Sequence, residues 1–263
     1  MRLTIATYNI NSVRIRLAEI RRLTEAAQPD ILCLQETKVE NDLFPAEDIK
    51  AMGYKYIYVS GQKSYNGVAL LSRHELSDIV HYDFLPGHKR HISASLKGVE
   101  IHNFYIPAGG DIPDREVNQK FDEKLRYYAS MAEWSHEQRK KNKRMVMVGD
   151  FNVAPLEHDV WSHKQLLKIV SHTPIETEAM AKLKDTLDWV DTSRHFVPHT
   201  EKLYSWWSYR NQDWAKSNRG RRLDHIWVTP ELAPGLVSSQ ILRDARSWDK
   251  ASDHVPVVTV VEV

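Results

Sequence analysis

Short runs of apolar and β-branched residues recur along the chain and predict its strands. Each run spans four to seven residues, which is the length of a strand rather than of a helix. The predicted strands are 3–8, 31–35, 54–59, 67–72, 92–96, 101–106, 145–148, 223–228 and 255–261.

Three longer segments carry apolar residues at helical spacing and predict helices. In the first of them, Leu17, Ile20 and Leu23 recur at every third position. The predicted helices are 16–27, 115–140 and 175–188. They interrupt the strands at irregular intervals, which argues against a simple alternation of strand and crossover helix.

The connections between neighbouring strands predict the type of sheet. Strands 54–59 and 67–72, like 92–96 and 101–106, are joined by too few residues for a crossover helix, so each pair should be antiparallel. No repeat or Ser/Gly/Pro-rich linker divides the chain. We therefore expect one domain over residues 1–263, with an α/β (α+β) four-layer sandwich of two packed, largely antiparallel or mixed β-sheets flanked by helices.

Polar side chains cluster at the ends of these predicted strands. They are Asn9, Glu36, Tyr105, Asp150, Asn152, Asp224, Asp253 and His254. Each one alone has a commoner explanation as a turn former or a helix cap. If several strand ends meet at one rim, however, these residues form an acidic pocket from segments far apart in the sequence.

The acidic set predicts a magnesium site. Mg²⁺ takes one or two protein carboxylates and keeps several waters and a substrate phosphate. Asp150 and Asn152, at alternate positions after a glycine, can point the same way, and Asp253 adjoins the titratable imidazole of His254. Zinc is a weaker alternative, because the thirteen histidines include no HExxH pair and no His pair with a cysteine partner.

Composition and charge exclude several classes of protein. No apolar run approaches the roughly 18 residues of a membrane helix, and the N-terminus lacks a signal-peptide pattern, so we expect a cytoplasmic protein with no membrane partner. The single cysteine, Cys33, excludes an internal disulfide and should be buried. With 36 Lys+Arg against 35 Asp+Glu the chain is nearly neutral, which argues against a passive nucleic-acid coat protein, since such proteins are strongly basic.

Four basic clusters are candidates for phosphate contacts. They are 13–22, 88–91, 139–144 and 219–222. We expect most of them to be solvated surface and 219–222 to contact phosphate, because of its neighbours in the sequence.

Nine motifs, in this order, make the chain resemble a known family. They are TYNINSVR (7–14), PDILCLQETKV (29–39), GVALLS (67–72), YIPAGG (105–110), GDFNVAP (149–155), WVDTSRH (189–195), YSWWSYR (204–210), NRGRRLDHI (218–226) and SDHVPV (252–257). This set is similar to the exonuclease III family of abasic-site DNA endonucleases, within the DNase I-like endonuclease/exonuclease/phosphatase superfamily. WVDTSRH, SWWSYR and NRGRRLDHI indicate the DNA-repair branch.

The resemblance implies a role for each matching residue. Glu36 would be the principal ligand of Mg²⁺, with Mn²⁺ as a substitute, and Asn9 and Asp253 would lie close by. Asp150 would position or deprotonate the attacking water, while Asn152 and Tyr105 would stabilise the phosphate oxygens. His254 would contact the scissile phosphate and Asp224 would orient its imidazole. The general base is either Asp150 or the Asp224–His254 pair.

The resemblance also implies the reaction. The chain would cut duplex DNA 5′ to an abasic site and leave a 3′-hydroxyl, with 3′→5′ exonuclease and 3′-phosphatase action on blocked 3′ ends, as a monomer. Trp206 and Leu223 would wall a pocket for the flipped-out sugar, with Trp207 in the core. Arg90, Lys38 and Arg219 would clamp phosphates.

Two departures from the family pattern fall near this pocket. Residues 108–111 follow Pro107 where many relatives have an amide residue, and Arg221 stands where some carry a tryptophan. Two rival functions remain open. One is a phosphodiesterase of the same fold acting on RNA, inositol phosphates or lipids, and the other is a non-catalytic DNA-binding module.

Overall fold

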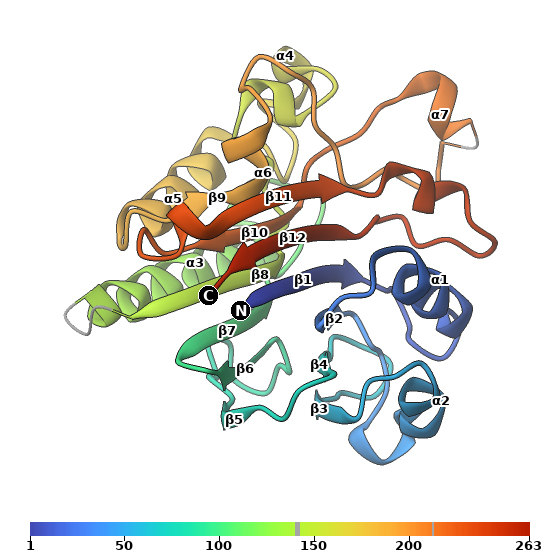
Figure 1. Cartoon of the computed structure of the whole chain (residues 1–263). Coiled ribbons are helices and arrows are strands. Elements are labelled where there is room, and N and C mark those ends of the chain that lie inside the picture. The colour runs from blue at the N-terminus through green and yellow to red at the C-terminus, as the bar shows by residue number, and fades with distance from the viewer. Residues whose placement is uncertain (140–142, 212) are drawn as a thin grey trace.

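The computed structural model describes residues 1–139, 143–211 and 213–263. These residues form two six-stranded sheets that pack face to face and carry helices on their outer faces (Figure 1). The predicted four-layer sandwich is therefore confirmed. Residues 140–142, which end the predicted helix 115–140 and belong to the basic cluster 139–144, lie outside the described residues.

The first sheet has the strand order β11-β12-β1-β2-β4-β3. Its strands are β1 (Arg2–Asn9), β2 (Ile31–Gln35), β3 (Tyr56–Ser60), β4 (Val68–Ser72), β11 (Leu236–Ile241) and β12 (Val257–Glu262). The β1–β2 pair is parallel and the other pairs are antiparallel, including the predicted β3–β4 pair.

The second sheet has the order β5-β6-β7-β8-β10-β9. Its strands are β5 (Ser77–Val80), β6 (His91–Leu96), β7 (Val99–Tyr105), β8 (Arg144–Asp150), β9 (Val190–Asp191) and β10 (Asp224–Val228). Here β7–β8 is the parallel pair, and the predicted β6–β7 pair is antiparallel.

Helices α1 (Leu17–Ala27) and α2 (Ala46–Ala51) pack on the outer face of the first sheet, and α3 (Gln119–Gln138) and α5 (Pro174–Asp185) pack on that of the second. The shorter helices are α4 (His163–Leu166), α6 (Thr192–Phe196) and α7 (Trp214–Ser217). Helix α3 begins four residues later than the predicted start, because the side chain of Asn118 caps it by accepting a hydrogen bond from the Lys120 backbone.

Alternate residues of the central strands face different apolar layers. In β1, Leu3 and Ile5 join the core between the sheets, whereas Ala6 and Tyr8 pack toward α1 and α2. Cys33 of β2 is fully buried in the core between the sheets, as predicted. Since both faces of these strands are buried, they read as continuous apolar runs, which is why the sequence identified them.

The strands that the sequence missed all lie at sheet edges. β11 is one edge of the first sheet, and β5 and β9 are the two edges of the second. Every residue of β5 is exposed, and β9 has only two residues. An edge strand with little buried surface needs no apolar run, so the hydrophobic pattern gives no signal there.

The strand ends that carry polar residues meet at one rim of the sandwich. The parallel pairs bring the carboxyl ends of β1, β2, β7 and β8 to this rim, and the antiparallel β10 and β12 bring their amino ends. The rim lies at the opposite side of the sandwich from the N and C termini (Figure 1). The amide of Asn9 donates to Asp150 over 2.9 Å and so joins the two sheets at the rim.

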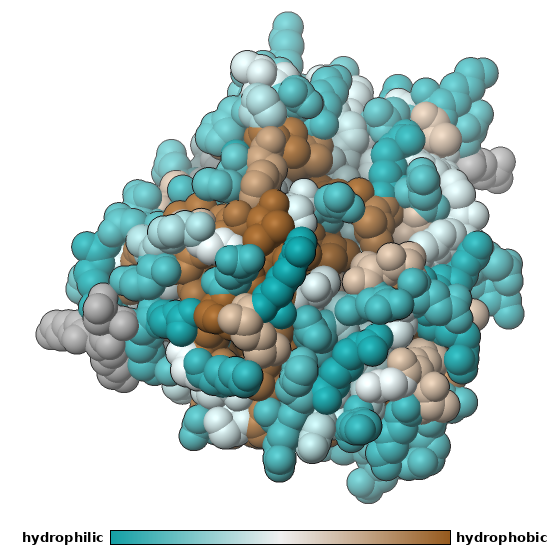
Figure 2. Space-filling view, viewed as in Figure 1, coloured by the Kyte–Doolittle hydropathy of each residue, from teal (hydrophilic) through white to brown (hydrophobic). Residues whose placement is uncertain are grey.

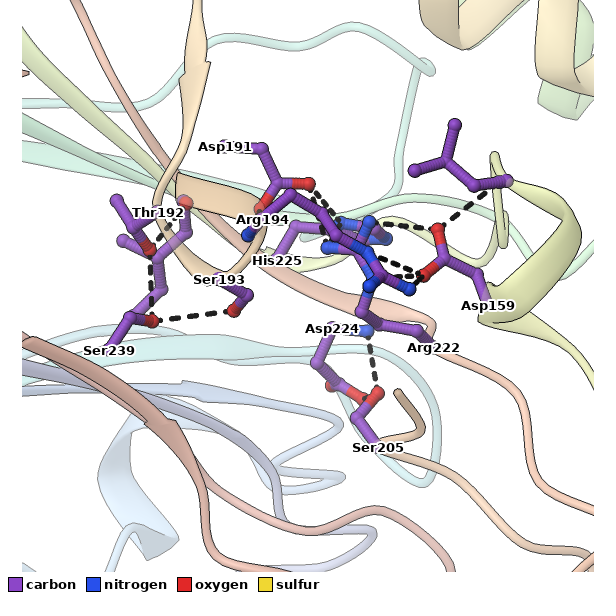
Figure 3. A network of polar contacts seen from close by, with 12 residues as sticks. Asp159, Asp191, Thr192, Ser193, Arg194, Ser205, Arg222, Asp224, His225 and Ser239 are labelled. Carbon is purple, nitrogen blue, oxygen red and sulfur yellow. Dashed lines mark hydrogen bonds and ion pairs between the residues drawn. The ribbon is translucent and has the colours of Figure 1, made fainter. Parts of the chain in front are cut away.

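A buried network of charges anchors the start of β10 (Figure 3). The fully buried guanidinium of Arg222 binds both oxygens of Asp159 at 2.8 Å and donates to Asp191 at 2.7 Å. Asp159 also accepts from Arg194. This contradicts part of one prediction, because Arg222 of the basic cluster 219–222 points into the protein and is not available to phosphate.

The face of the molecule seen in Figure 2 is mainly hydrophilic, with hydrophobic residues gathered near its middle. Leu236 and Val263 are partly buried and pack against the core between the sheets.

Within the described ranges, no helix has the length and apolar character needed to cross a membrane.

We predict that Arg222→Met destabilises the protein by about 3–5 kcal/mol, because the buried Asp191 would lose its guanidinium partner and Asp159 would keep only Arg194. Urea unfolding, followed by tryptophan fluorescence, measures the change in the free energy of unfolding. Arg14→Met, at an exposed position, is the control and should change it by no more than about 0.5 kcal/mol. Equal effects of the two substitutions would show that the network does not stabilise the fold.

Candidate functional site

Three groups at the rim lie close enough together to hold a metal ion. Ligand atoms of Glu36, Asp150 and His254 all lie within 4.8 Å of one another. Asn9 bridges the two carboxylates, since its amide nitrogen donates to each over 2.9 Å. The amide oxygen of Asn9 accepts from the Asn11 backbone, so here Asn9 acts as a donor to the acids.

Asp150 and Asn152 are held together by a tight turn. Asn152 has a left-handed backbone with φ of 53°, and its backbone N–H donates to Asp150 Oδ1 over 2.9 Å. Its amide nitrogen donates to Asp150 Oδ2 and to the Ile106 carbonyl. The two side chains therefore meet through a turn and not through strand alternation, and the amide of Asn152 orients the carboxylate of Asp150.

Asp224 and Asp150 lie on either side of the imidazole of His254. Its Nδ1 lies 2.8 Å from Asp224 Oδ2, and its Nε2 lies 3.7 Å from Asp150 Oδ2. Asp224 is fully buried and also accepts a hydrogen bond from the Ser205 hydroxyl over 2.7 Å. The carboxylate of Asp224 thus fixes which imidazole nitrogen faces Asp150.

Burial and neighbouring charges shift the pKa of each of these groups. Burial raises the pKa of Asp150 to about 7, although the His254 charge opposes it. Burial disfavours the imidazolium of His254, but the carboxylates of Asp224 and Asp150 outweigh it and raise that pKa to about 10. At neutral pH, Asp150 can exchange a proton while His254 stays charged.

Glu36 has the opposite electrostatic environment. Burial alone would raise its pKa, but the ammonium of Lys38, 2.8 Å from Oε2, together with Asn9 lowers it. Glu36 is therefore an anion with a cation beside it. A carboxylate in this state, next to a second carboxylate, suits a hard cation with oxygen ligands, so these residues fit Mg²⁺.

Asp253 lies outside the group formed by Glu36, Asp150 and His254. Its Oδ2 accepts from the Trp206 indole over 2.9 Å, and its Oδ1 accepts from the Asn11 amide over 3.3 Å. The sequence predicted Asp253 as a metal neighbour. In the structure its carboxylate links the rim to the side chain of Trp206.

Tyr105 and Arg90 lie together at the same rim. The guanidinium of Arg90 stacks over the Tyr105 ring, 4.5 Å from its centroid, and donates to the Tyr105 carbonyl. Burial, and then the charge of Glu36, raise the pKa of Tyr105 well above its ordinary value. Its phenol therefore stays protonated and can act as a hydrogen-bond donor.

A cavity of about 980 Å³ opens beside these residues. Trp206 and Leu223 line it, whereas Trp207 is buried in a separate apolar cluster. Residues of both departures from the family pattern also line it, namely Ala108, Gly110 and Asp111 on one side and Arg221 on the other. Arg219 lies on the cavity wall, and its guanidinium stacks over Trp161.

Three further residues, absent from the predicted set, support the site. Ser205 holds Asp224, and Asn11 holds Asp253. The buried ammonium of Lys124 donates to the Asn152 carbonyl over 2.8 Å. Asn11 and Ser205 could have been found, because they stand in the motifs TYNINSVR and YSWWSYR beside predicted site residues. Lys124 lies within a helix, where nothing in the pattern marks it.

Comparison with known proteins places this geometry in a family. Residues 6–254 match the Endonuclease/Exonuclease/phosphatase family. The chain belongs to this family. The match covers the motifs that carried the resemblance, from TYNINSVR to the start of SDHVPV.

Individual members of the family are similar over nearly the whole chain. Exodeoxyribonuclease III of Haemophilus influenzae is 32% identical over 95% of this chain and 97% of that protein. An AP endonuclease from Archaeoglobus fulgidus has a TM-score of 0.92 and 34% identity, covering 99% of this chain and 100% of that one. The 3′ phosphatase NExo from Neisseria, bound to a product DNA hairpin, has a TM-score of 0.90 and 30% identity with the same coverage.

The raised pKa of Asp150 predicts that Mg²⁺ affinity depends on pH. Below about pH 7 the carboxyl of Asp150 holds a proton, which a cation must displace, so affinity should rise with pH up to this value and then level off. Calorimetric titrations with Mg²⁺ between about pH 5.5 and 8.5 measure this dependence and the protons released. Asp150→Asn should remove it. A wild-type affinity that is constant over this range would contradict the prediction.

Proposed function

We propose that this chain is a magnesium-dependent DNA-repair phosphodiesterase that cuts the backbone 5′ to an abasic site and leaves a 3′-hydroxyl. The observation that carries the proposal is the position of Asp150, His254 and Glu36 beside a cavity walled by Trp206 and Leu223. The names of similar proteins, an exodeoxyribonuclease, an AP endonuclease and a 3′ phosphatase, support it. Trimming of blocked 3′ ends by exonuclease and 3′-phosphatase action belongs to the same proposal.

Glu36 would hold the metal ion, with the carboxylate of Asp150 beside it and Asn9 orienting both carboxylates. Mg²⁺ bound there supplies positive charge to the phosphate oxygens as the transition state forms. The ammonium of Lys38 lies 2.8 Å from Glu36 and neutralises its charge. When the metal ion takes over this pairing with Glu36, Lys38 would be free to contact the phosphate. Mn²⁺ should substitute, because it accepts the same oxygen ligands.

Asp150 is the general base in this proposal. Burial raises the pKa of Asp150, which makes its carboxylate a better proton acceptor for the attacking water. The neighbouring carboxylates of Asp224 and Asp150 favour the charged imidazolium of His254, which has no lone pair to accept a proton. His254 instead donates a charge-assisted hydrogen bond to a non-bridging phosphate oxygen, and Tyr105 offers a second donor. Asn152 acts by orienting Asp150.

Selection of the abasic site would take place in the cavity. Trp206 and Leu223 offer apolar surface to a flipped-out deoxyribose, and the missing base lowers the cost of flipping it. Arg90 and Arg219, both at the edge of the site, would contact flanking phosphates of duplex DNA. We propose that residues 1–263 act as one catalytic domain and as a monomer in the cytoplasm.

The test is a duplex that carries one tetrahydrofuran abasic analogue, incubated with and without Mg²⁺. We expect a single cut 5′ to the lesion only with Mg²⁺, and a rate lower by about 100-fold or more in Asp150→Asn, which lacks the base. Asp42→Asn, an acid-to-amide change at an exposed position, is the matched control and should cleave at the wild-type rate.

Full activity of Asp150→Asn, or cleavage of undamaged DNA alone, would overturn the proposal. Turnover of RNA, inositol phosphates or a phospholipid in place of DNA would identify the chain as a phosphodiesterase of another substrate class. Binding of DNA without turnover in the presence of Mg²⁺ would identify a non-catalytic module.

A further inference from the structure

The cavity beside the catalytic group has a guanidinium in its wall. Arg221 is partly buried, and its guanidinium carbon lies 5.2 Å from the centroid of the Trp206 ring. The backbones of the two residues also pair, with reciprocal N–H to carbonyl bonds of 2.9 and 3.0 Å. The ring and the guanidinium therefore lie against each other in one wall of the cavity.

A buried ion pair supports the segment that binds the guanidinium of Arg221. Arg221 Nη1 donates to the Val170 carbonyl over 2.9 Å and to the Ser171 hydroxyl over 2.7 Å. The carboxylate of Glu176 accepts from the Ser171 backbone, and it is paired with Lys124 where both side chains are fully buried. Arg221 is thus held by a rigid support. Such a support is needed by a residue that must point a hydrogen-bond donor in one direction.

One donor of Arg221 remains free in this arrangement. Nη1 makes two hydrogen bonds and Nε is enclosed without a partner, whereas Nη2 is neither enclosed nor bonded to any acceptor in the described part of the chain. A charged N–H group that has lost part of its water and has no protein acceptor is stabilised when a ligand supplies an oxygen as its hydrogen-bond acceptor.

The free donor lies close to the proposed chemistry. Trp206 pairs on one side with Arg221 and on the other with His254. Two strand spacings therefore separate Arg221 from His254, or about 10 Å between their backbones. A sugar attached to a phosphate at His254 and packed on Trp206 would lie within reach of the long arginine side chain.

We propose that Arg221 recognises the oxygen on C1′ of a base-free deoxyribose by donating a hydrogen bond from Nη2. This inference rests on the proposed function and adds a determinant of specificity to it. In a natural abasic site the C1′ hydroxyl or aldehyde oxygen replaces the base. The enzyme would then recognise the lesion by this oxygen as well as by the absence of the base. Apolar contact with Trp206 alone does not distinguish a sugar with this oxygen from one without it.

Three duplexes that differ only in the lesion test the inference. One carries a natural abasic site, one its borohydride-reduced form with a C1′ alcohol, and one tetrahydrofuran, which has no oxygen on C1′. We expect wild-type kcat/KM to be roughly tenfold higher for both C1′-oxygen lesions than for tetrahydrofuran. In Arg221→Met this preference should fall to within about twofold, through a loss on the oxygen-bearing lesions.

Arg243→Met is the matched control, because Arg243 also stacks over a tryptophan, Trp214, at 4.9 Å, but does not line the cavity. It should keep the wild-type preference. If Arg221→Met fails to fold, Arg221→Lys, which keeps the charge and loses the planar fork, should lower the preference by about threefold or more.

Equal wild-type rates on the three lesions, or an unchanged preference in the Arg221 variants, would overturn this inference and leave the proposed function standing. Absence of wild-type cleavage of all three lesions would overturn the proposed function itself. The two failures are therefore distinguishable in the same assay.

Discussion

The site depends on holding two carboxylates together in a place where burial disfavours negative charge. Asn9 donates to both Glu36 and Asp150, but each acid has a different cation beside it, Lys38 in one case and His254 in the other. The pKa of Glu36 falls and that of Asp150 rises. Unequal environments thus give two chemically identical groups separate tasks, one as a permanent anion and one as a group that exchanges protons.

The rest of the fold provides a rigid frame for this arrangement. Apolar layers fix the strands, and buried charges then hold the strand ends at the rim. Arg222, which directly precedes Leu223 and Asp224, is held in place by Asp159 and Asp191. Burying such charges costs free energy, so we interpret the network as a device that fixes position more than one that adds stability.

Three residues at the same rim have an unusual backbone conformation. Glu36, Lys38 and Asn152 all have positive φ, between 51° and 54°, in a region that side chains other than glycine rarely adopt. These turns point the side chains away from the direction that a continued strand would give them. Hydrogen bonds, such as that from Lys124 to the Asn152 carbonyl, hold the turn in place.

The sequence alone determined the central strands, the sandwich and the acidic residues at the strand ends, because apolar runs report burial and motifs report chemistry. It missed the edge strands β5, β9 and β11, which bury little, and it assigned Arg222 to the surface, because a charged residue carries no sign of a buried partner far along the chain. Packing between distant segments brings Asp253 to Trp206, places Ser205 and Lys124 behind the site, and makes Arg221 face the cavity. Each of these depends on contacts between distant segments, which no local pattern records.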